Sequence, residues 1–362
     1  MSNSLTASKE RRLRRCPAIL PVVVFLFWCL AFANRIFAQS DFYHGKTLTY
    51  VVGLLAGDST DLWSRSLTRQ MTKHIPGQPQ IIVQNMPGAG SLIAANYVYG
   101  VAKPDGLTMG SVSASHYFHQ LAGRKEAQFD WRKFSWIGSS ARHEYLFVMR
   151  GDTPYKSIED IRSASTAPKC SSTAPGSASY MTLKLLEEGL GLKFNIIGGY
   201  KGGQEQDLAI ERGEVQCRGV TTAAFLGRGP MQEWVKKGFL RVMLQTPPKR
   251  NAKLANVPTV YELMDRYRPS DAKRRVALVL LGGDNFGNFP TVATAGVPAD
   301  RVRILRDAYA KALREPELLD EAKKRSWEVE HITAEELENS AREVIDQPAD
   351  IIQRVKELLG GS

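Results

Sequence analysis

Five turns of the 362-residue chain are rich in Gly, Ser and Thr, and such turns are suited to binding anions. They are residues 57–60, 87–91, 111–115, 171–179 and 198–203. Small residues allow backbone N–H groups to approach a ligand, and a helix that begins after such a turn favours a negative charge. Each turn by itself is equally consistent with a tight connection. Their recurrence favours a ligand-binding edge.

Residues for catalysis or metal binding are sparse. The sequence has no G-x-x-x-x-G-K-[ST], G-x-G-x-x-G or G-x-S-x-G segment, so the common phosphate-binding, dinucleotide and hydrolase motifs are missing. His116 and His119 lack a neighbouring acid or cysteine to complete a metal site, and His116 is either a cleft hydrogen-bonding group or an ordinary helix residue. Asp61 is either a general base or a helix-capping group. We expect no metal, no cofactor and no enzymatic activity.

Strands and helices alternate along most of the chain, which predicts parallel sheets covered by helices, an α/β fold. We expect strands at residues 48–52, 80–84, 108–112, 146–149, 169–171, 194–197, 215–217, 241–244 and 276–281. We expect helices at residues 61–74, 92–101, 180–188, 205–212 and 231–237, and a mainly helical chain from residue 298. Ser157 and Thr333 each begin a segment with capping-box spacing, so each should open a helix. The Gly- and Ser-rich turns then fall at the carboxyl ends of strands, where ligands bind in such sheets.

The length is sufficient for two lobes. Because no linker of low complexity is present, we expect the lobes to be joined by crossing strands near residues 146–149 and 279–283. The expected division is a signal segment at residues 1–40, a first lobe at 41–146 plus 283–362, and a second lobe at 147–282.

The N-terminus has the pattern of a cleavable secretory signal: basic residues, an apolar run and small residues at Ala38 and Ser40. We expect cleavage before Asp41, with cleavage after Ala38 or an uncleaved anchor as alternatives. The first 40 residues hold six Lys or Arg against one acid, so the remaining chain keeps +6 of the net charge of +11. That charge is interspersed with acids, and nucleic acid is not expected as a partner.

Two cysteines remain after the signal segment, Cys170 and Cys217. Both lie in short strand-like runs, and export to an oxidising compartment makes a disulfide between them plausible if the strands are neighbours. The alternative is a pair of buried free thiols.

Several segments resemble the Bug-type extracytoplasmic receptors of tripartite tricarboxylate transporters. They are Asn-Met-Pro-Gly-Ala-Gly-Ser at residues 85–91, Pro-Asp-Gly at 104–106, Gly-Gly-Tyr-Lys-Gly-Gly at 198–203, Asn-Val-Pro-Thr at 256–259 and Gly-Val-Pro-Ala-Asp-Arg-Val at 296–302. The resemblance covers essentially the whole chain after the signal segment. It implies a type II-like, two-lobe periplasmic binding protein, in which each lobe is a mainly parallel sheet with flanking helices. The ligand cleft would lie between the lobes.

The resemblance further implies that loops of both lobes hold a small organic acid. The ligand-binding candidates are Asp58, Asp61, Asn85, Ala89, Gly90, Ser91, Ser113, Ser115, His116, Ser172, Thr173, Ser177, Tyr200, Lys201 and Gly202. The chain departs from the family at residues 57–60, where the family has consecutive glycines. There Asp58 either caps the following helix and points away, or occupies the cleft and favours a ligand with an amino or amide group. A second departure is at residues 282–294, before Gly-Val-Pro.

These features favour a monomeric periplasmic receptor that closes around a carboxylate and delivers it to the permease subunits of a transporter. One alternative is the same binding module acting on a sensor protein. Another is an exported enzyme on the same fold, for which the sequence shows no positioned acid–base pair.

Overall fold

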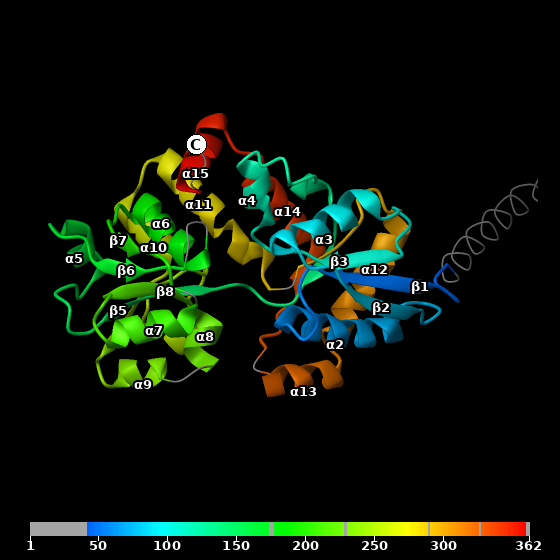
Figure 1. The fold of residues 1–362 in the computed structure, drawn as a ribbon, viewed down its shortest axis with the longest axis horizontal. Coiled ribbons are helices and arrows are strands. Elements are labelled where there is room, and N and C mark those ends of the chain that lie inside the picture. The colour runs from blue at the N-terminus through cyan, green and yellow to red at the C-terminus, as the bar shows by residue number, and fades with distance from the viewer. Residues whose placement is uncertain are drawn as a thin grey trace, which may run out of the picture.

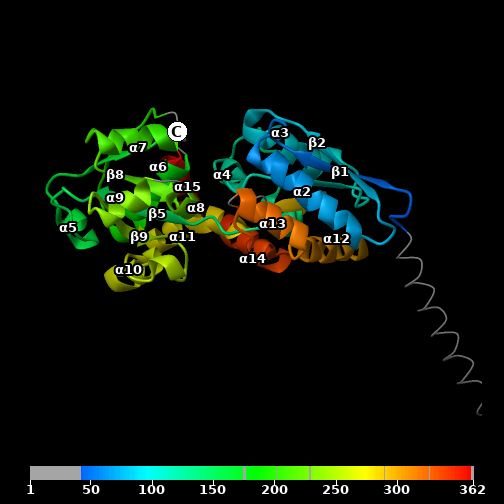
Figure 2. The same ribbon diagram turned by 90° about the horizontal axis from the view of Figure 1, so that it is seen from below.

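The computed structural model describes residues 42–173, 177–200, 202–227, 230–288, 290–325 and 327–359. The expected signal segment and Lys201 lie outside the described residues. Two sheets lie next to each other, each with helices on both faces, as Figures 1 and 2 show. Within the described ranges, every helix is too short or too polar to cross a membrane.

The first sheet has the strand order β11-β4-β10-β3-β1-β2. Its strands are β1 (Thr47–Val52), β2 (Gln80–Asn85), β3 (Thr108–Ser111), β4 (Ser135–Ser139), β10 (Thr291–Ala293) and β11 (Ile332–Thr333). Strand β1 pairs in parallel with β2 and β3, whereas β10 runs antiparallel between β3 and β4. The first lobe is therefore built from both ends of the described chain.

Helices of the first lobe cover both faces of this sheet. They are α2 (Ser59–His74), α3 (Leu92–Asn96), α4 (His116–Leu121), α12 (Ala299–Ala312), α13 (Pro316–Arg325) and α14 (Ala334–Ile345), with the short turns η1 (Ala89–Ser91), η2 (Tyr97–Val101) and η3 (Trp131–Lys133). Helix α2 buries Trp63, Leu67 and Met71, spaced four residues apart along one helix face. They share a core with Tyr309 of α12. Thr333 forms the expected capping box at the start of α14.

The second sheet has the strand order β7-β6-β8-β5-β9. Its strands are β5 (Tyr145–Arg150), β6 (Lys169–Ser171), β7 (Asn195–Ile197), β8 (Cys217–Thr221) and β9 (Leu240–Gln245). Around it lie α5 (Ile158–Ser163), α6 (Ala178–Leu190), α7 (Gly203–Glu211), α8 (Thr222–Gly227), α9 (Met231–Lys236), η4 (Ala252–Leu254) and α10 (Val260–Tyr267). In Figure 1, α6 and α10 cover one face, and α7, α8 and α9 cover the other. Ser157 forms the expected capping box before α5.

The return from the second lobe to the first is a helix, α11 (Asp271–Phe286), and the strand expected at residues 276–281 is wrong. Ser270 caps this helix by accepting a hydrogen bond from the backbone N–H of Lys273. Helix α11 packs between α6, α14 and α15 (Ala349–Leu358) and is buried on several sides. Its sequence at residues 276–281 is therefore a continuous apolar run, which is also typical of a buried strand. Periodicity alone does not separate a buried helix from a buried strand.

Two contacts fix α11 closely to the first lobe. The hydroxyl of Tyr117 on α4 donates to the carbonyl of Val279 at 2.8 Å and accepts from the N–H of Gly283 at 3.0 Å. A Cβ added to Gly282 would lie 2.2 Å from Cγ1 of Val344 on α14. Helix α11 therefore contacts α6 of the second lobe and α4 and α14 of the first.

Cys170 and Cys217 face each other in the parallel pair of β6 and β8, and a disulfide joins them. Their Cα atoms are 4.4 Å apart. For a sequence separation of 47 residues, the chain-entropy model gives such a bridge a stabilisation of about 4 kcal/mol.

Candidate ligand-binding site

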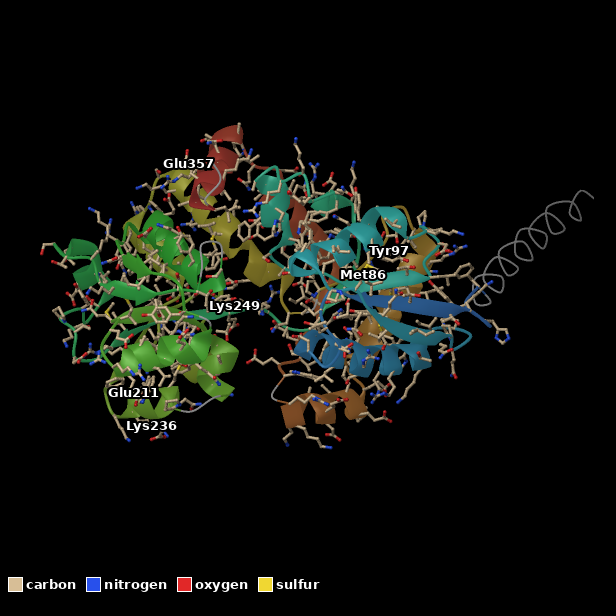
Figure 3. The ribbon with its side chains drawn as sticks, viewed as in Figure 1. Met86, Tyr97, Glu211, Lys236, Lys249 and Glu357 are labelled. Atoms are coloured by element: carbon tan, nitrogen blue, oxygen red, sulfur yellow. A yellow bond between two sulfur atoms is a disulfide. The ribbon has the colours of Figure 1, made fainter. Side chains whose placement is uncertain are left out.

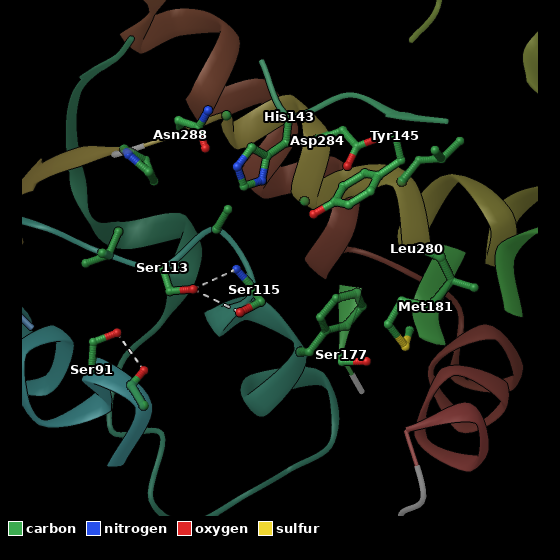
Figure 4. A pocket seen from close by; sticks show the side chains of 18 of the residues that line it. Ser91, Ser113, Ser115, His143, Tyr145, Ser177, Met181, Leu280, Asp284 and Asn288 are labelled. Atoms are coloured by element: carbon green, nitrogen blue, oxygen red, sulfur yellow. Dashed lines mark hydrogen bonds between the residues drawn. The ribbon is translucent and has the colours of Figure 1, made fainter. Parts of the chain in front are cut away.

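A cavity of ≈ 510 Å³ lies between the two sheets (Figure 4). Its described walls come from the ends of β1 and β3, from η1, from α6 and from α11. It is lined by Gly53, Leu54, Thr60, Gly90, Ser91, Ser111, Val112, Ser113, Ala114, Ser115, Phe118, His143, Tyr145, Ser177, Met181, Thr182, Leu185, Thr246, Leu280, Leu281, Gly283, Asp284, Gly287, Asn288 and Pro290. The lining mixes hydroxyl groups with an apolar surface, as is usual for sites that bind small organic molecules.

Hydroxyl groups of the first lobe form one wall. Ser113 and Ser115 follow β3, and their side-chain oxygens are 2.9 Å apart. Ser91 belongs to η1, and Figure 4 shows it on the same side of the cavity as Ser113. Oγ of Ser91 donates to the carbonyl oxygen of Gly90 at 2.5 Å, and one hydroxyl of the Ser113 and Ser115 pair donates to the other, which leaves one hydroxyl proton of the pair for an anion. The wall places no positive charge in the cavity.

The turn that carries Ser91 is shaped by its neighbours. Residues 88–91 all have positive φ, with Ala89 at 46° and Ser91 at 66°. His116 lies behind the turn, and its Nε2 is 3.1 Å from the carbonyl oxygen of Gly90 and 3.3 Å from Oγ of Ser91. Burial lowers the pKa of His116 to about 4. The imidazole is therefore neutral at pH 7 and can donate its Nε2 proton to Gly90.

The second lobe supplies the opposite wall. Ser177, Met181, Thr182 and Leu185 line the cavity from the N-terminal half of α6 and its cap. Thr246 follows β9 and is buried. This wall contributes the apolar side chains of Met181 and Leu185.

Four further residues complete the cavity: His143 of the crossing at residues 140–144, Tyr145 at the start of β5, Asp284 of α11 and Asn288 just after α11. Oγ1 of Thr246 donates to Oδ2 of Asp284 at 2.8 Å. Burial, together with the nearby Glu144, raises the pKa of Asp284 to about 8. Burial lowers the pKa of His143. Near pH 7 the cavity wall therefore contains a mostly protonated carboxyl beside a neutral imidazole.

Five of the candidates from the sequence line this cavity: Gly90, Ser91, Ser113, Ser115 and Ser177. Ala89 and His116 support the turn from outside the lining. Ser172, Thr173, Tyr200 and Gly202 belong to the segments after β6 and β7 and are not part of the lining.

The acidic candidates near α2 have structural contacts. Asp58 caps the helix by accepting from the N–H of Thr60 at 3.0 Å, and it is not part of the cavity lining. Asp61 is buried and accepts from the N–H of Gly57, from Arg65 and from Asn85. These bonds outweigh the effect of burial and lower the pKa of Asp61. Asp61 and Asn85 thus hold the start of α2 against the end of β2.

Sequence reasoning missed His143, Tyr145, Thr246, Asp284 and Asn288. The available signal was Asp284, a single acid directly after a long apolar run. A strand at residues 276–281, as the sequence predicts, gives no reason to place Asp284 in a cavity. Among the described residues, no group of three or more His, Cys, Asp or Glu side chains could hold a metal ion.

Comparisons with known proteins agree with this architecture. Residues 64–356 match the model of the "Tripartite tricarboxylate transporter family receptor" family. A relative from Cupriavidus necator, "UPF0065 protein in gbd 5'region", is 28% identical over 323 residues, which are 88% of this chain and 90% of the relative.

Two solved structures share the fold. A TctC solute binding protein from Polaromonas, without ligand, matches with a TM-score of 0.67 and 20% identity, covering 88% of this chain and 99% of that chain. MatC from Rhodopseudomonas palustris, with bound malate, matches with a TM-score of 0.52 and 20% identity, covering 86% and 98%.

Proposed function

The chain belongs to the tripartite tricarboxylate transporter receptor family, and on this premise we propose that it closes around a small organic acid and delivers it to the permease subunits of such a transporter. The observation that carries the proposal is the cavity of ≈ 510 Å³, whose described walls come from both lobes. A receptor of this kind works by binding its ligand more tightly in a closed state than in an open one.

The wall of the first lobe is the proposed carboxylate site. Ser113 and Ser115 follow β3 and offer a hydroxyl donor to an anion. MatC, which has a similar fold, is described with bound malate, and this supports an acid as the ligand class. The apolar surface of Met181, Leu185 and Leu280 would then contact the carbon chain.

Export through a cleavable signal at residues 1–40 is part of the proposal. N-terminal sequencing of protein purified from the periplasm should begin at Asp41. A chain that still begins at Met1 would contradict cleavage and favour the membrane anchor. A chain that begins at Gln39 would move the cleavage site to Ala38.

We propose a division into a first lobe at residues 41–146 plus 283–362 and a second lobe at 147–282, because the strands of the two sheets come from these parts of the chain, apart from Tyr145 and Leu146, which begin β5 of the second sheet. Strand β5 already pairs with β8 and β9 from Tyr145 onward. We therefore propose that residues 140–144 and α11 are the two connections that bend when the lobes close.

A ligand screen tests the function. The protein purified from the periplasm is heated with di- and tricarboxylates, aromatic acids, amino acids and amides. A ligand that binds only the folded state raises Tm. We expect at least one carboxylate to raise Tm, and deletion of the gene should abolish uptake of that acid by cells.

Matched variants locate the binding. Replacement of Ser113 and Ser115 by Ala should remove most of the shift in Tm, because both hydroxyl groups line the cavity. The Ser163→Ala variant, on the exposed face of α5, should respond like the unmodified protein. The proposal is wrong if no carboxylate changes Tm, or if both variants lose the response equally.

A further inference from the structure

One carboxyl group stands in the cavity wall away from the serines. Among the described residues that line the cavity, Asp284 is the one Asp or Glu, and no Lys or Arg lines it. Figure 4 shows it beside Tyr145 and His143, with Ser91 and Ser113 on the other side. A ligand that reaches both walls would meet hydroxyl groups at one end and this carboxyl at the other.

The local hydrogen bonds leave Asp284 only partly satisfied. Oγ1 of Thr246 accepts from the N–H of Tyr145 at 2.9 Å and donates its single proton to Oδ2 of Asp284. Among the described residues, this is the one side-chain hydrogen bond to the carboxyl of Asp284. Asp284 is half-buried and is one of the residues that line the cavity. One carboxyl oxygen therefore remains for a ligand.

Within the described part of the chain, Glu144 is the one charged group that acts on the pKa of Asp284. No Lys or Arg is among the described residues that line the cavity. Burial and Asp284 together raise the pKa of Tyr145, of Tyr117 on α4 and of Tyr261 on α10. His143 lines the same cavity. Glu144 adds negative charge, and the three tyrosines are neutral. A second carboxylate brought next to Asp284 would face repulsion without a countercharge.

We propose that Asp284 selects a ligand that carries a cationic nitrogen as well as a carboxylate. The carboxylate binds the serine wall, formed by Ser91, Ser113 and Ser115 of the first lobe, while the nitrogen pairs with Asp284. This inference rests on the proposed function and names the substrate class of the same cavity. The cationic nitrogen neutralises the carboxylate of Asp284, and a zwitterion with one carboxylate, such as 4-aminobutyrate, adds no net charge to the cavity. Burial, the largest cause of the raised pKa of Asp284, disfavours its charged form, and a cationic nitrogen would stabilise that form.

The test compares acids that differ by one amino group. Binding of succinate and aspartate, of glutarate and glutamate, and of butyrate and 4-aminobutyrate is measured by calorimetry. We expect the amino member of at least one pair to bind at least about tenfold more tightly than its partner, because a buried charge that is left unpaired is costly. In the Asp284→Asn variant this preference should disappear, with the fold confirmed by an intact thermal transition.

The pH dependence adds a second readout. Pairing requires the charged form of Asp284, so affinity for the amino acid should rise between pH 6 and pH 8, with release of a proton on binding. The Asp284→Asn variant should lose this dependence. The Asp58→Asn variant is the matched control, because it also removes a carboxylate but at an exposed helix cap outside the cavity lining.

The outcomes separate the two proposals. If the plain acids bind more tightly and their affinity falls as pH rises, Asp284 acts as a neutral donor to a second carboxylate, and the proposal is overturned. An unchanged preference in Asp284→Asn overturns it as well. If none of the six acids binds and the broader carboxylate screen is also negative, the proposed function itself fails.

Discussion

Ala89 and Ser91 hold a backbone conformation that residues other than glycine rarely adopt, with φ of 46° and 66°. Each such residue costs about 1 kcal/mol or more, and such strain is concentrated at functional sites. Here the strain aims a polar turn at the cavity. His116 compensates in part, since its buried ring is within hydrogen-bonding distance of Gly90.

Gly53 is the residue on which this turn depends most closely. A Cβ at this position would lie 2.2 Å from Cβ and 2.9 Å from Cα of Ser91. Gly53→Ala should therefore displace the turn at a cost of about 1–3 kcal/mol, and ligand affinity should fall about tenfold or more. Calorimetry with the best acid from the screen measures this effect. Gly100→Ala is the control, because its Cβ would meet nothing within 4 Å; equal losses in both variants would contradict the argument.

Asp284 should lower the free energy of unfolding of the protein without added ligand as pH rises. Its pKa is about 8 in the folded state and near 3.8 when unperturbed, so the folded state holds a proton that the unfolded chain releases between these values. The stability present below pH 3.8 is therefore lost progressively as pH rises through 8. Asp284→Asn removes this loss, and we expect its Tm to exceed that of the unmodified protein by a few degrees at pH 8 and to match it near pH 4. Calorimetric scans without ligand measure both; a constant difference across this range would contradict the assignment.

At the scale of elements, α11 and α14 pack closely against each other. Gly282 leaves no room for a side chain against Val344. Gly282→Ala should destabilise the protein by about 1–3 kcal/mol through overpacking. Addition of Val344→Ala should recover part of this loss, since it removes the methyl group that clashes. Urea unfolding of the two single variants and the double variant measures the coupling, and strictly additive effects would show that the two residues do not press on each other.

The sequence predicted elements whose pattern is local. The strands near residues 47–52, 80–85 and 108–111 and the helix near 59–74 were found because their apolar residues and their caps are adjacent in the chain. The short strands β4, β10 and β11 were missed, since each pairs only with a distant segment. Helix α11 was misassigned because its burial comes from α6, α14 and α15.

The contrast between local patterns and contacts of distant segments also explains which residues of the site could be predicted. The serines follow predicted strands in Gly- and Ser-rich turns, and the family resemblance gave four of them, Ser91, Ser113, Ser115 and Ser177, as candidates. Asp284, Thr246 and Tyr145 meet only when a helix and two antiparallel strands of the second lobe are placed together. A hydrogen bond between residues 38 apart in the sequence has no local signature. Residues at the carboxyl ends of strands are predictable, whereas residues on a returning helix are not.

At the scale of the whole molecule, the connections between the lobes define the motion that binding requires. Residues 140–144 and α11 run between the sheets, and Arg354 of α15 forms an ion pair with the largely buried Glu188 of α6. In Figure 1, α11 and α15 lie on one side of the molecule, and α9 and α13 lie on the opposite side of their lobes. Closure about these connections should therefore bring α9 and α13 closer together.

Spin labels test this motion. Lys236 on α9, labelled in Figure 3, and Lys324 on α13 are both exposed and can be replaced by labelled cysteines. The distance between the labels should shorten when a ligand from the screen is added, because a receptor that binds its ligand in the closed state shifts toward that state. A control pair at Lys46 and Lys324, both in the first lobe, should keep its distance. If the first pair is also unchanged at saturating ligand, the lobes are already closed around the cavity, and selection of the ligand rests on the fixed arrangement of the serine wall and Asp284.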